Sequence, residues 1–298
     1  MTTSPSDGST AVVGAGVMGR GVALSLLLYG RKVVLVDLDE DVLDAARREL
    51  VERARLYPMM APHLPRIAQA DLVGALTLSP DLAKASHCDF VIENATEDWS
   101  VKRPIYRRLD ALCAPGTIFA ANTSAMPISR LAEETGRPER VIGMHFMNPA
   151  PLKRTVEVVR GARTSADTLE TACALLAGIG KRAIVVNDSP GFVTNRVMML
   201  MVNEAAAALH EGVASAEDID QLFRECFGHR MGPLRTCDLI GIDTVKRSLD
   251  VLYGEFRHSK YLPCPLIVEM VESGRLGCKS GHGFFTYPSQ PPSSRVDM

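Results

Sequence analysis

A histidine and a glutamate lie twelve positions apart, each within an apolar setting. His145 follows the apolar run 141–144, and Glu157 lies at the centre of the β-branched run 155–159. An imidazole titrates near neutral pH and can remove a hydroxyl proton, while a carboxylate can fix its tautomer and stabilise the imidazolium. The two residues are therefore candidates for a general base and its orienting partner. A histidine at a strand end, taken alone, is more often structural.

A glycine-rich turn near the start of the chain predicts a dinucleotide site. The segment 14–19 fits G-x-G-x-x-G, directly after a β-branched run and before a helical pattern. Gly14 permits a tight turn, Gly16 lets a pyrophosphate approach the helix N-terminus, and Gly19 allows the helix to pack closely on the strand. We expect these glycines, with Val17 and Met18, to form the cofactor-binding turn.

Asp37 follows the second predicted strand, eighteen residues after Gly19. A carboxylate at this place would accept hydrogen bonds from both ribose hydroxyls of NAD and would repel the extra phosphate of NADP. A strand-end cap is the alternative role. With a candidate base downstream, NAD binding at this turn favours a redox reaction over nucleotide binding alone.

The elements that must position these residues form an α/β pattern. We expect strands over 10–13, 32–36, 90–93, 117–121, 141–144, 155–159 and 182–186, with helices between several of them. This alternation predicts a Rossmann-like, doubly wound parallel sheet. Ligands bind at the carboxyl ends of such strands, so His145 is expected to emerge at the ligand-binding edge.

The pattern divides the chain into two expected domains. Residues 1–187 form the NAD-binding domain, with a helical hairpin near 40–75: a helix over 41–56, then a second helical piece after Pro58, Pro62 and Pro65. Residues 188–298 form an all-α domain, whose first helix is expected to start at the segment 188–191 with a polar cap before Pro190. Its helices are expected over 192–211, 215–226, 234–256 and 263–273. The Met-rich stretch 198–201 is expected to be a packed helix face.

Bulk properties exclude several classes of function. The net charge is −2 and no basic stripe suggests nucleic acid. No leader pattern and no apolar stretch of membrane-spanning length is visible, so no membrane association is expected. The seven cysteines form no C-x-x-C pair, which argues against a metal site and a disulfide framework and favours the cytoplasm.

Six motifs, in order, resemble the 3-hydroxyacyl-CoA dehydrogenase family over about residues 10–287. They are the glycine turn, Asn122-Thr-Ser124, His145-Phe-Met-Asn-Pro149 with Val156-Glu-Val158, the segment 188–196, Gly232-Pro233 with the segment 238–243, and the segment 279–284. The resemblance implies reversible NAD-dependent oxidation of a 3-hydroxyacyl thioester to the 3-oxoacyl thioester. It also implies a homodimer formed through the helical domain, with the substrate in a cleft between the domains.

The resemblance also assigns roles to single residues. His145 is implied to be the base and Glu157 its partner, while Ser124 and Asn195 flank the substrate. Asn148 helps to hold the site, and three further residues match positions that line the nicotinamide half of the pocket: Glu97, Lys102 and Asn122. Each has a plain structural alternative. Ser124 and Asn148 could cap turns, Asn195 could bond to its own helix, and Glu97 with Lys102 could be a solvated pair.

One region departs from the family pattern and leaves the acyl carrier open. Residues 38–83 contain no lysine, where the family usually has lysines that hold CoA, but they contain five arginines. Lys153 and Arg154 also stand where apolar residues are common. A thioester on an acyl carrier protein, as in polyketide extender-unit pathways, is therefore an alternative to CoA, since arginines could bind an acidic carrier.

Two other functions remain open from the sequence. Hydroxyacid dehydrogenases of the β-hydroxyacid group share a similar glycine turn and a helical second domain, but they use a lysine as acid–base group. A scaffold that binds NAD without turnover is the second alternative. The presence of His145, Glu157, Ser124 and Asn195 argues against it.

Overall fold

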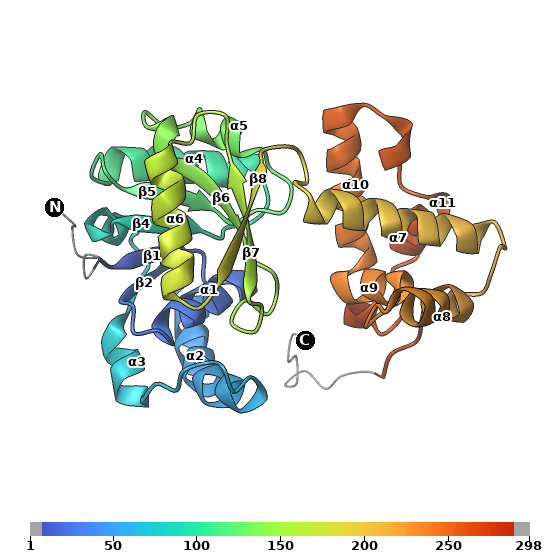
Figure 1. Ribbon diagram of the computed structural model, residues 1–298, viewed down its shortest axis with the longest axis horizontal. Helices are drawn as coiled ribbons and strands as arrows, with labels where there is room; N and C mark the ends of the chain where they lie inside the picture. Colours follow the sequence, from blue (N-terminus) through green and yellow to red (C-terminus); the bar gives the residue numbers. More distant parts are fainter. Residues whose placement is uncertain (1–7, 289–298) are drawn as a thin grey trace. The chain divides into compact units, whose positions relative to one another are not determined.

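The computed structural model describes residues 8–288, which fall into two compact units. The first unit ends at Ser189 and the second begins at Pro190. Each is described by itself below, and Figure 1 labels their elements. Among the helices of residues 8–288, none combines the length and the apolar composition needed to span a membrane.

The first unit is built on one eight-stranded sheet. Its spatial order is β3-β2-β1-β4-β5-β6-β7-β8, and every pairing is parallel except β6 with β7. The strands are β1 (Thr10–Val13), β2 (Val33–Val36), β3 (Leu76–Ser79), β4 (Phe90–Glu93), β5 (Ile118–Ala121), β6 (Val141–His145), β7 (Thr155–Arg160) and β8 (Arg182–Asn187). The mostly parallel, Rossmann-like sheet confirms the predicted fold class.

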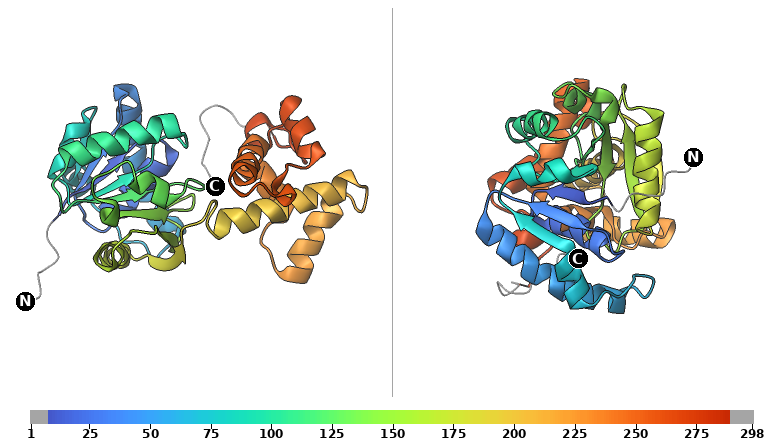
Figure 2. Two further views of the ribbon diagram at one scale, coloured as in Figure 1. Left: turned by 90° about the horizontal axis from the view of Figure 1, so that it is seen from above. Right: turned by 90° about the vertical axis from the view of Figure 1, so that its left-hand side faces the viewer.

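Helices cover both faces of the sheet, as Figures 1 and 2 show. They are α1 (Val17–Leu27), α2 (Glu40–Met60), α3 (Gln69–Ala75), α4 (Trp99–Leu112), α5 (Ile128–Ala132) and α6 (Ala166–Gly178). Apolar residues of α1, α2 and α6 form one core with alternate strand residues such as Val12, Ile92 and Met144. On α4, buried Tyr106 meets Phe119 of β5 edge to face. A sheet buried on both faces explains why its central strands are continuous apolar runs.

The strand order reverses between β1 and β4. The chain winds from β1 to β2 and β3 on one side, and from β4 outward on the other. Ligands of open α/β sheets bind in the crevice at such a reversal, beyond the carboxyl ends of the strands. The turn after β1 and the residues after β4 therefore lie at the expected ligand-binding point.

The second unit is helical in the part that the structure describes. Its helices are α7 (Thr194–His210), α8 (Ala216–Phe227), α9 (Pro233–Ile240), α10 (Ile242–Phe256) and α11 (Pro265–Glu272). Its core joins Met199, Val202, Leu249 and Ile267. Met199 is buried, and its neighbours Met198 and Leu200 pack against the same core, so the Met-rich stretch is a packed helix face as predicted.

Three predictions for the first unit were wrong in detail. Helix α2 does not end near residue 56 but continues through Pro58 to Met60. Strand β3 was missed because its four residues form a partly exposed edge strand without a continuous apolar run. The reversed direction of β7 was also not foreseen.

Two helix boundaries of the second unit also differ from the prediction. Helix α7 begins at Thr194 without a side-chain cap, while the Asp188 carboxylate accepts hydrogen bonds from the backbone N–H groups of Ile128 and Ser129 at the start of α5. The single helix expected over 234–256 is two helices, because Gly241 adopts φ +99° between them. A positive φ of this kind interrupts a right-handed helix.

Candidate active site

His145 and Glu157 lie side by side at the carboxyl edge of the sheet. His145 ends β6, Glu157 is its cross-strand partner on β7, and Nδ1 of the imidazole lies 2.9 Å from Oε2 of the carboxylate. Directly paired residues of an antiparallel ladder project from the same face, which explains the contact. His145 is 7% exposed and Glu157 is 4% exposed, so the pair is shielded from bulk water.

The glycine turn has the geometry of an anion-binding helix start. Gly16 is the N-cap of α1, and neither a side-chain cap nor an acidic residue occupies the first turn. A Cβ built on Gly16 meets no atom within 4 Å, whereas a Cβ on Gly19 would lie 1.8 Å from the carbonyl oxygen of Gly14. Gly19 is thus required by packing, and the space above Gly16 is open for a pyrophosphate on the free N–H groups.

Asp37 lies beside this turn, directly after β2. Its Oδ2 accepts a hydrogen bond of 2.7 Å from the backbone N–H of Ala15, and its Oδ1 accepts one of 3.2 Å from that of Asp39. Each carboxylate oxygen can accept a further hydrogen bond, so the side chain retains capacity for ribose hydroxyls. The turn and Asp37 together fit NAD.

Two asparagines connect the strand ends between the cofactor turn and His145. Asn122, after β5, donates through Nδ2 to Oδ1 of Asn94 at 2.7 Å, and its own Oδ1 accepts from the backbone N–H of Phe146 at 3.0 Å. A Cβ on Gly14 would lie 2.8 Å from the carbonyl oxygen of Asn94. Asn122 therefore fixes the strand ends relative to one another. Asn94 was missed by the sequence reasoning.

Glu97 organises the turn that carries Ser124. Its Oε1 accepts hydrogen bonds from the hydroxyl of Thr123 and from the backbone N–H groups of Ser124 and Ala125. Ser124 is exposed, and its hydroxyl has no hydrogen-bond partner within residues 8–288. The hydroxyl is therefore available to a ligand at this edge.

Lys102 is a buried ion-pair partner, so its interpretation as part of a solvated pair was wrong. It is fully buried, and its ammonium lies 2.8 and 2.9 Å from the two carboxylate oxygens of Glu93 at the end of β4. Glu97 is farther away, at 3.9 Å. Burial raises the pKa of Glu93, and the neighbouring ammonium acts against that rise. Glu93 was not foreseen, although a charged residue that ends an apolar strand is a visible signal.

Asn148 and Asn195 are the remaining predicted site residues. Asn148 is exposed in the loop that leaves His145. Asn195 is the second residue of α7, and its amide nitrogen is buried without a hydrogen-bond partner among the described residues. A buried, unpaired amide donor is costly unless a ligand completes it.

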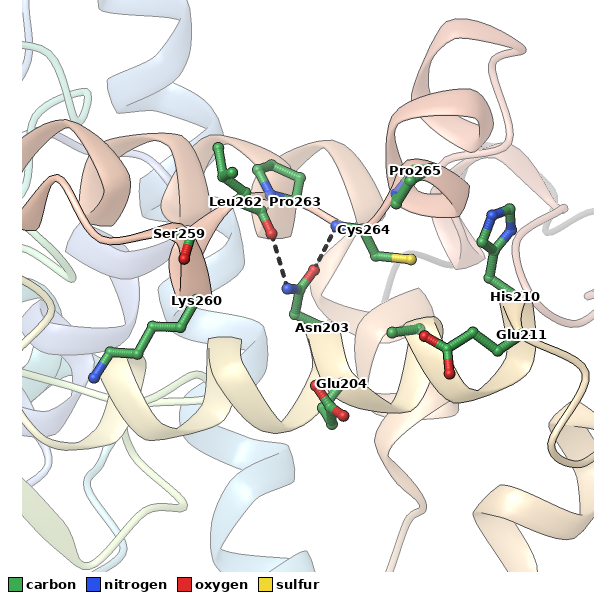
Figure 3. A pocket seen from close by; sticks show the side chains of 11 residues that line it. Asn203, Glu204, His210, Glu211, Ser259, Lys260, Leu262, Pro263, Cys264 and Pro265 are labelled. Atoms are coloured by element: carbon green, nitrogen blue, oxygen red, sulfur yellow. Dashed lines mark hydrogen bonds between the residues drawn. The ribbon is translucent and has the colours of Figure 1, made fainter.

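A cavity of about 520 Å³ lies in the second unit and holds none of the predicted residues. It lies between α7 and the segment 259–265. There Asn203 donates to the carbonyl of Leu262 and accepts from the N–H of Cys264, both drawn in Figure 3. This amide attaches α7 to the segment before α11, which is a structural role.

The first unit thus combines four chemical functions at one sheet edge. It offers a helix start for a pyrophosphate, a carboxylate for a ribose, a buried imidazole–carboxylate pair for proton transfer, and an available hydroxyl at Ser124. This combination can remove a proton from a substrate hydroxyl next to a dinucleotide.

Comparison with known proteins gives the same picture. Residues 9–189 match the model of the 3-hydroxyacyl-CoA dehydrogenase NAD binding domain, and residues 191–287 match that of the 3-hydroxyacyl-CoA dehydrogenase C-terminal domain. A probable 3-hydroxybutyryl-CoA dehydrogenase of Bacillus subtilis is 41% identical over 93% of this chain and 96% of its own length. A 3-hydroxybutyryl-CoA dehydrogenase of Bradyrhizobium diazoefficiens is 41% identical over 94% and 96%. The crystal structure of (S)-3-hydroxybutyryl-CoA dehydrogenase from Ralstonia eutropha has a TM-score of 0.88 at 37% identity, covering 94% and 99%.

Proposed function

Because the chain belongs to the 3-hydroxyacyl-CoA dehydrogenase family, we propose that His145 and Glu157 carry out its NAD-dependent oxidation of a 3-hydroxyacyl thioester. The observation that carries the proposal is the 2.9 Å contact between the two side chains at the sheet edge that also holds the glycine turn. An ionised carboxylate only accepts hydrogen bonds, so Nδ1 carries the hydrogen and Nε2 is the basic nitrogen.

The reaction couples one proton transfer to one hydride transfer. Nε2 of His145 takes the proton of the C3 hydroxyl as the C3–O bond becomes a carbonyl. When bound at the glycine turn, NAD would supply the acceptor for the hydride of C3. Glu157 stabilises the imidazolium that forms, and in the reverse direction the protonated His145 returns its proton to the carbonyl oxygen.

Other residues are proposed to hold the substrate and the cofactor. The Ser124 hydroxyl, presented by the Glu97-bonded turn, contacts the substrate oxygen, and the Asn195 amide donates to the thioester carbonyl. Asn148 helps to hold the site. Asn122 and Lys102 act in this proposal through the strand ends that they fix, beside the nicotinamide half of the cofactor.

We propose CoA as the first candidate for the acyl carrier, because similar proteins are named 3-hydroxybutyryl-CoA dehydrogenases. An acyl carrier protein is the second candidate. The end of α2 favours it, since Leu56, Met59 and Met60 are exposed beside the exposed Arg55. Exposed apolar side chains with a neighbouring arginine suit an acidic protein better than a free nucleotide.

An NADH absorbance assay tests this proposal. Reduction of acetoacetyl-CoA is compared with that of an acetoacetyl carrier protein and of short polar 3-oxoacyl carriers, and acetoacetate is the free-acid control. Faster turnover of a thioester than of the free acid supports the proposed reaction. The ratio of kcat/KM between the carriers identifies the preferred acyl carrier. NAD binding without turnover of any thioester would contradict the proposed reaction and favour a scaffold role.

The family resemblance also predicts a homodimer, which is checked by analytical sedimentation.

A further inference from the structure

Lys181 is a buried lysine that the proposed reaction does not use. It precedes β8 and is 7% exposed. Within residues 8–288 no carboxylate pairs with its ammonium, which donates instead to the carbonyl oxygens of Ala150 at 2.6 Å and Lys153 at 2.8 Å. A buried charge held only by two carbonyls is costly, so its retention needs an explanation.

The two carbonyls belong to the loop 146–154, which joins His145 to the strand of Glu157. Within it, the N–H groups of Leu152 and Lys153 both bond to the carbonyl of Pro149. The ammonium therefore holds a compact turn that begins directly after Asn148. Asn148 is exposed, and it lies between Phe146, whose N–H is held by Asn122, and this turn.

The same turn packs on the cofactor helix. A Cβ built on Gly21 of α1 would lie 3.2 Å from the Cβ of Ala150. At the other end of α1, a Cβ on Gly180 would lie 2.1 Å from the hydroxyl of Tyr29, so the backbone before Lys181 also contacts the residues after this helix. Lys181 thus joins α1 to the loop that carries Asn148.

We propose that Lys181 is a positioning residue for the reaction: its ammonium fixes the turn 149–153 against α1 and thereby places Asn148 beside His145. The inference rests on the proposed function, in which Asn148 helps to hold the site. A role in folding alone would change stability and leave catalysis intact, which separates the two explanations.

The test is a double-mutant cycle on the full-length enzyme. Lys181→Met keeps an unbranched side chain that is one atom shorter and removes the donors, and Asn148→Ala removes the amide. Turnover with the best thioester and NAD affinity by fluorescence are measured well below each melting temperature. Lys181→Met is expected to lower kcat about tenfold or more, because a small displacement of a group at the reacting centre strongly lowers the rate of reaction. NAD affinity is expected to change less than about threefold, since the glycine turn packs at Gly14 against the backbone of Asn94 and not against the turn 149–153.

Coupling between the two sites is the decisive readout. In the Asn148→Ala background, Lys181→Met is expected to lower kcat much less than in the wild type, because both substitutions remove the same positioned amide of Asn148. Lys181→Arg, which keeps the charge and the donors, is expected to recover part of kcat. Lys32→Met, a change at an exposed lysine, is the control and leaves kcat unchanged.

Several outcomes would overturn the inference. These are a folded Lys181→Met enzyme with wild-type kcat, additive effects of the two substitutions, or failure of both Lys181→Met and Lys181→Gln to fold, which would make the role structural only. A wild-type enzyme that is inactive on every thioester would instead contradict the proposed function, and it is recognised before any variant is made.

Discussion

Nδ1 of His145 lies 2.9 Å from Oε2 of Glu157 across the β6–β7 ladder. The contact is buried and is made by two strands rather than by a flexible loop. An imidazole held in this way keeps one tautomer without further reorganisation during proton transfer.

Substitution of this pair is expected to affect turnover and not cofactor binding. His145→Gln removes the base and should abolish measurable oxidation, while Glu157→Gln should lower kcat by about 10²-fold or more, within the range of general acid–base catalysis. Steady-state kinetics with an NAD titration by fluorescence measures both. An active His145→Gln enzyme would remove the histidine from the mechanism.

Two glycines of the cofactor turn are expected to respond differently to the same added methyl group. Gly16→Ala places the methyl group in open space at φ −67°, so stability should change by less than about 1 kcal/mol while NAD affinity falls about tenfold or more. Gly19→Ala brings the methyl group against the carbonyl of Gly14, and overpacking should cost about 1–3 kcal/mol. Urea unfolding measures the stability of both variants, and titration with NAD measures their affinity for the cofactor. Equal losses of stability would contradict the assigned roles.

Asp37 is expected to set the preference for NAD over NADP. Asp37→Asn keeps an acceptor oxygen for Ala15 but removes the charge, so the ratio of kcat/KM for NAD to that for NADP should fall about tenfold or more. Asp39→Asn is the matched control, because Asp39 caps α2 and asparagine caps equally well. A preference unaltered by Asp37→Asn would assign the carboxylate to the turn alone.

Lys181 is expected to make stability depend on pH. Burial lowers its pKa from 10.5 to about 8. Below pH 8 both the folded and the unfolded chain carry the proton, and the folded chain bears the full cost of the buried charge. Between pH 8 and 10.5 the unfolded chain binds more protons, so this group makes the free energy of unfolding rise with pH, by about 3 kcal/mol in total. Urea unfolding of the wild type and of Lys181→Met at pH 7.5 and 9.5 measures the contribution of Lys181 to this pH dependence. Parallel pH dependences would contradict the shift.

Much of the first unit could be predicted because its central strands, such as β1, β4 and β5, are buried on both faces and form apolar runs. The same runs located His145 and the glycine turn, since a polar residue that ends such a run stands out. Glu93 ends β4 in the same manner, and it could have been recognised by this signal.

Other features depend on partners that are distant in sequence. The direction of β7 follows from the nine residues 146–154, which are too few for a parallel crossover, and this length was an available signal. The acceptors to which Lys102, Asn122 and Lys181 donate carry no local pattern, because each bond joins residues nine or more positions apart. The break at Gly241 was also hidden, since the apolar spacing continues across it.

The antiparallel pairing of β6 and β7 makes the register of β7 essential for the contact between His145 and Glu157. Side chains alternate along a strand, so a slip of one residue would bring Val156 or Val158 opposite His145 and turn Glu157 to the other face of the sheet. Strand β8, paired with all six residues of β7, opposes such a slip. Exchange of one apolar residue for another in β7 should therefore be tolerated far better than the gain or loss of a single residue. The chemistry of this edge depends on a count of positions as much as on the residues that occupy them.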